Sequence, residues 1–436
     1  MMALILIKWL VYLVLLPAQA LNDKENNSEK SVYIKREGRS YHMMRNGAKY
    51  IIKGVSGTEQ LGLLKHTGGN FITVFHNQCT TELLDSAQSL QVSVGVIFEM
   101  GKPVFGYNYR DREFIRNQQG EIEDFVRKFK NHPAILFWVI GNEVHLGRII
   151  NWRVWRSVNA ISKSVHQIDP DRPTTTTIAG LGIPGLQTVQ VKLFCSDIDF
   201  LSFNIFDSYH RVKREVRNFI WGWEGPYLIT EFSPAPYWNL PTTEWGAIIE
   251  QPATYRAEQF RVFYSTLTSD TERCIGTCAF YWGEKQERTH TSFSLILGEE
   301  FKTQSVQSLS YCWTGIEPGI RCPEIIRYHI LGHENRRDIY LEASKPFASI
   351  FDVLNFDKTA LLYRWEILEE GAYQNMTVGR RETRPKRHSG GELESDSILF
   401  TFIAPEETGA YRLFFYATDE HKNIASANIP FYVLKE

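Results

Sequence analysis

From about residue 50 to residue 313, two kinds of apolar pattern alternate along the chain. Short, uninterrupted apolar runs suit strands that are buried on both faces. Between them lie longer stretches in which apolar positions recur at a helical period, at residues 81–90, 111–131 and 152–168. The expected strands cover residues 50–54, 70–75, 92–98, 135–140, 174–179, 198–206, 227–232 and 276–282.

Eight strands with intervening helices match a (β/α)8 barrel, the TIM barrel of the α/β class, in number, order and size. A doubly wound sheet is the alternative. That fold would need a glycine-rich phosphate turn early in the chain, and the sequence has none. We therefore expect a barrel that spans residues 47–315.

The pattern changes after residue 315, where Pro318, Cys322 and Pro323 indicate a linker. Short alternating runs follow, separated by turns rich in Gly, Asp, Asn and Glu. They predict a small all-β sandwich of the immunoglobulin or fibronectin kind over residues 316–436. The alternating runs cover residues 348–354, 361–367, 397–402, 411–417 and 429–434.

The first 20 residues have the pattern of an export signal. Lys8 follows a short apolar start, residues 9–16 are uniformly apolar, and residues 17–20 end in a small-x-small cleavage pattern. An uncleaved N-terminal anchor is the alternative. We expect a secreted, periplasmic or extracellular protein that does not insert into a membrane after signal cleavage, with a polar leader and N-terminal segment at residues 21–46.

Composition narrows the range of partners. A net charge of −2 over 436 residues argues against nucleic acid or an anionic membrane as the main partner. The 11 Trp, 20 Tyr and 27 Phe provide many flat faces of the kind that sugar rings pack against.

An exported chain permits disulfides among its six cysteines, and Cys312 with Cys322 is the pair to test first. No cysteine spacing suits zinc, and we expect neither a metal nor a cofactor.

Two of the predicted strands end in glutamate. The run 135–140 stops at Gly141, Asn142 and Glu143, and the run 227–230 leads directly into Glu231. The carboxyl ends of parallel strands form the active-site face of such barrels. Two carboxyl groups on that face are the minimum equipment for acid, base and nucleophilic work on a glycosidic bond.

These two motifs carry a family resemblance. The stretches 138–143 and 229–232 resemble the acid/base and nucleophile strands of retaining glycoside hydrolases with a clan A barrel, and more closely the glycoside hydrolase family 2-like TIM-barrel proteins. Residues 281–289 resemble the eighth-strand region of such proteins. Stretches at 363–366, 409–412 and 427–431 resemble an accessory β-sandwich that accompanies some of them.

The resemblance implies roles for the paired motifs. Glu143 is then the general acid and base, Glu231 is the nucleophile, and Asn142 binds the sugar 2-hydroxyl. A retaining mechanism implies carboxyl groups roughly 5 to 5.5 Å apart. We expect repulsion and weaker solvation to raise the pKa of Glu143, while hydrogen bonds keep Glu231 ionised.

The resemblance also suggests supporting residues. Trp282 is expected to form the floor beneath the sugar, with a core tryptophan as the alternative. Asn204 and Tyr209 follow the sixth strand, where related barrels place a group that touches the nucleophile. His76 follows the second strand and is a candidate substrate ligand or a structural histidine. Loop tryptophans around the seventh strand line sugar subsites or serve in packing: Trp221, Trp223 and Trp238.

One position departs from the family pattern. Many relatives carry an arginine near the end of the second strand, and here the matching residue is Thr73. Loss of a nearby cation should raise the pKa of the nucleophile. Either another group, such as His76, substitutes for it, or activity is reduced.

The predicted function is a secreted retaining β-glycosidase that acts on a β-linked glucan or related polysaccharide. A β-glucan transglycosylase, and a weak or inactive carbohydrate-binding barrel, are the alternatives. Family 2 enzymes usually carry β-sandwich domains before the barrel, and residues 21–50 leave no room for one, so galactosidase or glucuronidase activity is not expected by name. The substrate is the expected partner, and the sequence leaves the oligomeric state open.

Overall fold

The computed structural model describes residues 30–146, 149–180, 185–206, 209–212, 222–298, 300–371, 382–393 and 399–435. The predicted export signal and Trp221 lie outside these ranges. Within them, no helix is both long and apolar enough to cross a membrane.

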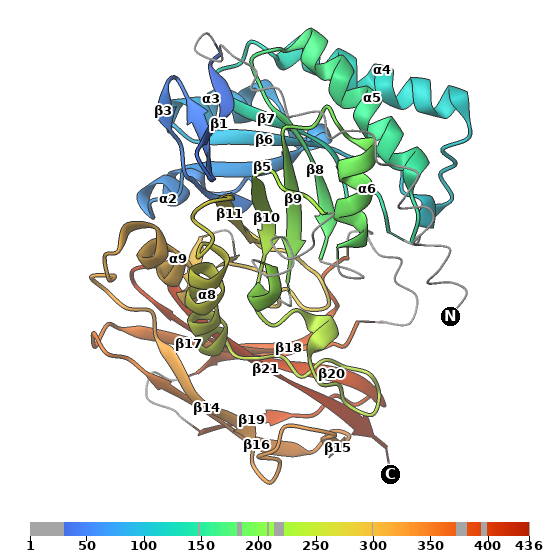
Figure 1. The fold of residues 1–436 in the computed structure, drawn as a ribbon. Coiled ribbons are helices and arrows are strands. Elements are labelled where there is room, and N and C mark those ends of the chain that lie inside the picture. Colours follow the sequence, from blue (N-terminus) through green and yellow to red (C-terminus); the bar gives the residue numbers. More distant parts are fainter. Residues whose placement is uncertain are drawn as a thin grey trace, which may run out of the picture.

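Residues 52–280 contain the eight parallel strands of a closed barrel (Figure 1). Neighbouring strands follow chain order around the barrel, and β11 closes it against β4. Side chains of these strands are almost all buried, which explains their uninterrupted apolar runs. The TIM-barrel prediction is confirmed. The strands are β4 (Ile52–Ser56), β5 (Phe71–Phe75), β6 (Ser93–Phe98), β7 (Ile135–Asn142), β8 (Thr174–Ala179), β9 (Phe200–Ile205), β10 (Tyr227–Phe232) and β11 (Cys274–Phe280).

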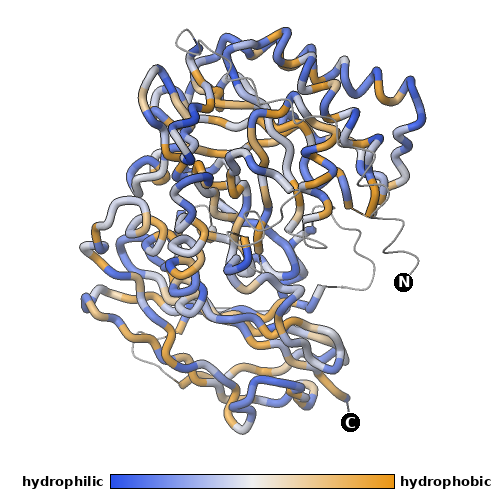
Figure 2. Tube along the Cα trace, in the orientation of Figure 1, coloured by the Kyte–Doolittle hydropathy of each residue, from blue (hydrophilic) through white to orange (hydrophobic). Residues whose placement is uncertain are grey.

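Helices surround the barrel and bury one apolar side against it. In α4, Ile122, Val126 and Phe129 are buried, and the Asp111 side chain caps the first turn by accepting two backbone N–H groups. Figure 2 shows the resulting alternation of apolar and polar residues along these helices. The helices are α2 (Leu61–His66), α3 (Thr81–Ser89), α4 (Arg112–Phe129), α5 (Trp152–Ile168), α6 (Leu186–Phe194), α8 (Ala253–Leu267) and α9 (Gln304–Thr314), with 3-10 turns η1 (His76–Gln78), η2 (Pro103–Phe105), η3 (Tyr209–Arg211) and η4 (Tyr237–Asn239).

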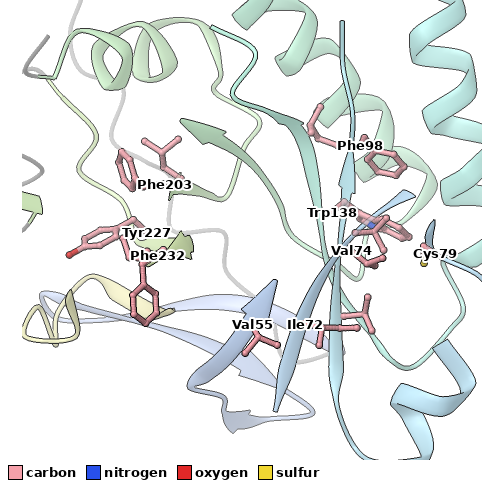
Figure 3. Packing of buried hydrophobic residues seen from close by; sticks show 14 of the residues in the cluster. Val55, Ile72, Val74, Cys79, Phe98, Trp138, Phe203, Tyr227 and Phe232 are labelled. Atoms are coloured by element: carbon pink, nitrogen blue, oxygen red, sulfur yellow. The ribbon is translucent and has the colours of Figure 1, made fainter. Parts of the chain in front are cut away.

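The main core fills the space between the strands and the helices. Phe98 and Trp138, from β6 and β7, stack with ring centroids 5.8 Å apart. Figure 3 shows this pair near Val74 and Cys79, and a second group around Phe203 and Tyr227. This packing fixes the strand ends that carry the candidate site.

A small antiparallel sheet closes the amino-terminal end of the barrel, in a segment where the sequence predicted only a leader and N-terminal segment. Its strands are β1 (Val32–Glu37), β2 (Ser40–Arg45) and β3 (Ala48–Lys49). Val32 and Met43 are buried in one cluster with side chains from the barrel interior, such as Phe137. The Val32 N–H donates to the Asp171 carbonyl just before β8. This sheet therefore seals the end of the barrel opposite the strand ends at Glu143 and Glu231.

The C-terminal part is all-β, as predicted, and consists of two facing sheets. The larger sheet has the order β12-β13-β21-β20-β17-β18, with β15 paired to β21, and the smaller sheet is β14-β16-β19. Phe351 of β16 stacks on Phe415 of β20 at 5.0 Å, within the apolar core between the sheets. The strands are β12 (Ile296–Leu297), β13 (Phe301–Thr303), β14 (Glu324–Ile330), β15 (Tyr340–Glu342), β16 (Pro346–Leu354), β17 (Leu361–Glu369), β18 (Arg387–Leu393), β19 (Leu399–Ile403), β20 (Gly409–Asp419) and β21 (Asn423–Leu434).

All six cysteines lie within the described ranges and are free thiols. Cys312 and Cys322, the pair to test first, are therefore not joined by a disulfide in this structure. The Cys322 thiol is buried and donates to the Lys302 carbonyl at 3.7 Å, whereas Cys312 lies on α9. Burial raises the pKa of the Cys312 thiol to about 11, so this thiol stays protonated at neutral pH.

Met43→Ala tests the closure of the barrel by the N-terminal sheet. Met43 is 1% exposed, and its truncation leaves a cavity against the barrel interior. We expect the free energy of unfolding to fall by about 2–4 kcal/mol, measured by urea denaturation followed by tryptophan fluorescence. Arg39→Ala, at an exposed turn of the same sheet, is the control and should change it by less than about 0.5 kcal/mol. Equal effects of the two substitutions would contradict this role.

Candidate active site

Glu143 emerges from the carboxyl end of β7 through an unusual backbone turn. Gly141 has φ 83°, and Glu143 itself has φ 56°, in the left-handed region that non-glycine residues rarely adopt. The Glu143 N–H donates to the Thr177 carbonyl of β8 at 2.9 Å, which stabilises this turn. The strained conformation directs the Glu143 side chain toward the residues at the ends of neighbouring strands.

Asn204, at the end of β9, connects Glu143 to the rest of the site. Its Nδ2 donates to Glu143 Oε1 at 2.9 Å and to Asn142 Oδ1 at 3.2 Å. Its own Oδ1 accepts a hydrogen bond from Thr230 Oγ1 at 2.9 Å. The resemblance suggested that Asn204 touches the nucleophile, but its amide instead binds the predicted general acid.

Glu231 lies next to Asn204 in the register of β10 against β9. Burial and, second to it, the charge of Glu143 raise the pKa of its carboxyl group to about 8. Lys285 and Lys102 oppose this shift, and Glu287 adds to it. Among the described residues, no hydrogen bond reaches the Glu231 carboxyl group. The expectation that hydrogen bonds keep Glu231 ionised is therefore wrong for the free protein.

Thr73 belongs to a chain of hydrogen-bonded hydroxyl groups that ends at the carbonyl of Thr230, the residue before Glu231. Thr73 Oγ1 donates to Ser56 Oγ at 2.9 Å, and Ser56 Oγ donates to the Thr230 carbonyl at 3.1 Å. These hydroxyls link β5, β4 and β10 and satisfy one another inside the barrel. They carry no charge, so the position where relatives place an arginine contributes only hydrogen bonds here.

Aromatic rings gather after the carboxyl ends of β9 and β10 and at the end of β11. Phe206 contacts Trp238 and Phe280, with ring centroids at 5.3 and 5.4 Å, and Phe293 packs against the same rings. Trp238 is 49% exposed and is available to a ligand. Its expected role in a sugar subsite stays a prediction. Trp223 instead donates its Nε1 hydrogen to the Pro226 carbonyl and packs against the core.

Three other predicted site residues serve in packing in this structure. Trp282 has no exposed surface and lies in the main core, so its ring is not accessible as a sugar floor in this conformation. Tyr209 stacks on Phe263 of α8 at 3.6 Å, away from the hydrogen bonds around Glu143. The His76 ring contacts Phe98 and Phe125, so this histidine does not replace the missing arginine.

The loop after β11 brings charged residues to the site that sequence reasoning missed. Lys285 Nζ lies 3.3 Å from Glu287, and the Glu284 N–H donates to Glu59 Oε2 at 3.3 Å. The sequence signal that could have identified Lys285 and Glu287 is their position shortly after a predicted strand.

Burial lowers the pKa of His145, two residues after Glu143, to about 4, so this histidine is neutral at neutral pH. The described residues contain no cluster of side chains suited to hold a metal ion.

The C-terminal sheets hold this loop in place. The Arg288 N–H donates to Glu382 at 2.6 Å, and Arg384 forms ion pairs with Glu284 at 3.4 Å and Glu366 at 2.5 Å. One ring nitrogen of His290 lies 2.6 Å from the Tyr416 hydroxyl of β20. The C-terminal part therefore supports one wall of the site through several polar contacts.

Comparisons with known proteins agree with the barrel fold. A family model described as the TIM barrel domain of glycosyl hydrolases family 2 matches residues 83–274. A β-galactosidase of Bacteroides ovatus is 25% identical over 298 residues, which cover 59% of this chain and 31% of that protein. The barrel of this chain is therefore similar to the TIM barrel domain of glycosyl hydrolases family 2.

Solved structures show the same fold. The β-glucuronidase 2 of Bacteroides uniformis, bound covalently to cyclophellitol-6-carboxylate aziridine, has a TM-score of 0.50 and 13% identity over 93% of this chain and 48% of its own. A β-glucuronidase of Ruminococcus gnavus has a TM-score of 0.50 and 15% identity over 66% of this chain and 53% of its own. The chain thus spans about half the length of these structures and about a third of the curated relative.

Glu231→Gln tests the protonation state of the buried carboxyl. The native pKa of about 8 lies above the ordinary 4.5, so folding favours the neutral form. As pH rises from about 4.5 to about 8, the wild-type protein should lose stability relative to Glu231→Gln, by on the order of 1 kcal/mol per pH unit. Thermal unfolding at a series of pH values measures this difference. Glu121→Gln, exposed on α4, is the control, and a pH-independent difference for Glu231→Gln would contradict the raised pKa.

Proposed function

We propose that this protein is a retaining β-glycosidase. The observation that carries the proposal is the bridge from Glu143 through Asn204 to the strand position beside Glu231, which assembles two carboxyl groups at one end of the barrel. Two such groups suffice for double displacement at an anomeric carbon. In this proposal Glu231 is the nucleophile and Glu143 is the general acid and base.

For the reaction to begin, Glu143 must carry a proton and Glu231 must be ionised. In the first step the Glu231 carboxylate attacks the anomeric carbon, the bond to the leaving oxygen breaks, and Glu143 gives its proton to that oxygen. In the second step Glu143 takes a proton from water, which attacks the glycosyl-enzyme and releases Glu231. The raised pKa of Glu231 means that the free site favours the proton on the nucleophile. The nearby cations and the bound substrate must therefore shift this proton from Glu231 to Glu143 before the first step.

Asn142 and Trp238 are proposed to bind the sugar. Asn142 is fixed beside the acid by Asn204, where its amide is suited to a hydroxyl of the reacting sugar. Trp238, exposed in the aromatic group near β10, offers a flat face to a further sugar unit. We propose a β-linked glucan or related polysaccharide as substrate and an exported protein, with β-galactosides and β-glucuronides as alternatives that the names of the relatives suggest.

One observation favours a second candidate, a carbohydrate-binding barrel with little activity. Thr73 provides no charge near Glu231, and the Glu231 carboxyl is protonated over much of the neutral range in the free protein. A neutral carboxyl group is a poor nucleophile. Under this alternative, sugars bind at the same barrel end without cleavage.

A substrate panel separates the two functions. The purified protein is incubated with β-glucan oligosaccharides and with aryl β-glucosides, β-galactosides and β-glucuronides, and products are followed by mass and anomeric configuration. We expect products of retained configuration, with transfer to a second sugar marking transglycosylation. Glu143→Gln should lower kcat on unactivated substrates by about 10²–10⁴-fold, and Glu231→Ala should abolish turnover.

Azide provides the matched chemical control. With an activated aryl glycoside, azide should restore turnover to Glu231→Ala and give a glycosyl azide of inverted configuration, because the small anion takes the place of the missing carboxylate. Glu121→Gln should retain wild-type turnover. Sugar binding without cleavage by the wild-type protein across the whole panel would instead establish the binding function.

A further inference from the structure

Lys285 lies beside the strand that carries Glu231. Its Nζ is 5.4 Å from the ring centroid of Phe280 and 5.6 Å from that of Tyr281, at the carboxyl end of β11. The β10 and β11 strands are neighbours, with Phe232 opposite Ala279. The ammonium group therefore lies over the end of the strand adjacent to the one that ends with Glu231 and Phe232.

The backbone around Lys285 is fixed by hydrogen bonds. The Lys285 N–H donates to Ser294 Oγ at 2.8 Å, and Ser294 Oγ donates to the His290 carbonyl at 2.6 Å. The neighbouring Glu284 carboxylate accepts a hydrogen bond from the Gly298 N–H at 2.7 Å. The backbone position of Lys285 is thus set by the loop and by the C-terminal sheets that hold the loop. Because this backbone is already fixed, less conformational entropy is lost when the Lys285 side chain approaches a carboxylate.

The charges that face Glu231 come from three strand ends. Glu143 faces it from β7, Lys102 from the loop after β6, and Lys285 with Glu287 from the loop after β11. Within β11, the Cys278 thiol also lies near Glu231, and its pKa is raised well above the ordinary value by burial, so it is neutral. Lys285 is the larger of the two cationic influences on Glu231, ahead of Lys102.

We propose that Lys285 is a positioning residue for Glu231, and that its ammonium group supplies the positive charge that favours the Glu231 carboxylate where Thr73 supplies none. The role rests on the proposed function, in which Glu231 must be ionised to attack the sugar. A cation beside Glu231 moves the shared proton toward Glu143, where it is needed for the leaving group. Glu287, paired with Lys285 at 3.3 Å, keeps the ammonium group at the mouth of the barrel.

A direct titration of Glu231 tests the inference without relying on turnover. The full chain is labelled with carbon-13 at glutamate carboxyl groups, and the Glu231 signal is assigned by its loss in Glu231→Gln. We expect Lys285→Met to raise the Glu231 titration midpoint by about one pH unit, whereas Lys285→Arg should leave it near the wild-type value. Lys345→Met, an exposed lysine in the C-terminal part, is the control. An unchanged midpoint in Lys285→Met would overturn the inference.

Activity provides a second, independent readout. If the protein turns over a β-glycoside, the acidic limb of its kcat/KM profile should move to higher pH in Lys285→Met, and kcat at pH 7 should fall about tenfold. A uniform loss at all pH values would indicate a merely structural role and contradict the inference. A protein that cleaves nothing but still shows the shifted midpoint would refute the glycosidase function and leave the role of Lys285 intact.

Discussion

The repulsion between the carboxyl groups of Glu143 and Glu231 is the constraint on which the rest of the site depends. Two negative charges in a partly buried barrel mouth cannot both persist without compensation, and burial alone already favours the neutral form of Glu231. The Asn204 amide donates to Glu143, which stabilises negative charge on that side. The compensation for Glu231 comes from lysines on loops, because the hydroxyl of Thr73 carries no charge.

This arrangement gives the loop after β11 an electrostatic role at the site. It carries Lys285 and Glu287, and it is held by polar contacts from the C-terminal sheets, including those to Arg384 and Tyr416. A flexible loop would place the ammonium group only part of the time and weaken its electrostatic effect. The two-sheet C-terminal part therefore contributes to the electrostatics of the site as well as to stability.

The barrel strands could be predicted from sequence because strands buried on both faces require uninterrupted apolar runs, as in β7 and β10. The same logic located Glu143 and Glu231 at strand ends. The N-terminal sheet was missed because its strands are short, partly exposed and rich in charge, and only their packing on the barrel gives them structure. Domain boundaries near residue 315 stay a prediction.

The supporting residues were harder to predict because their roles depend on side-chain direction. Tyr209 and His76 follow the expected strands, yet their rings pack on Phe263 and Phe98. Lys285 has no motif of its own. Its importance arises from the folded neighbourhood, in which strands far apart in sequence bring opposite charges together.

The most direct test of the central claim is to trap the covalent intermediate. The protein would be treated with 2-deoxy-2-fluoro β-glycosides that carry an activated leaving group, digested, and analysed by peptide mass spectrometry. The fluorine slows both steps, and the good leaving group allows the first step to outrun the second, so the intermediate accumulates. The account predicts a single sugar adduct on the Glu231 carboxyl group. An adduct on another residue, or none with a sugar that the protein hydrolyses, would contradict it.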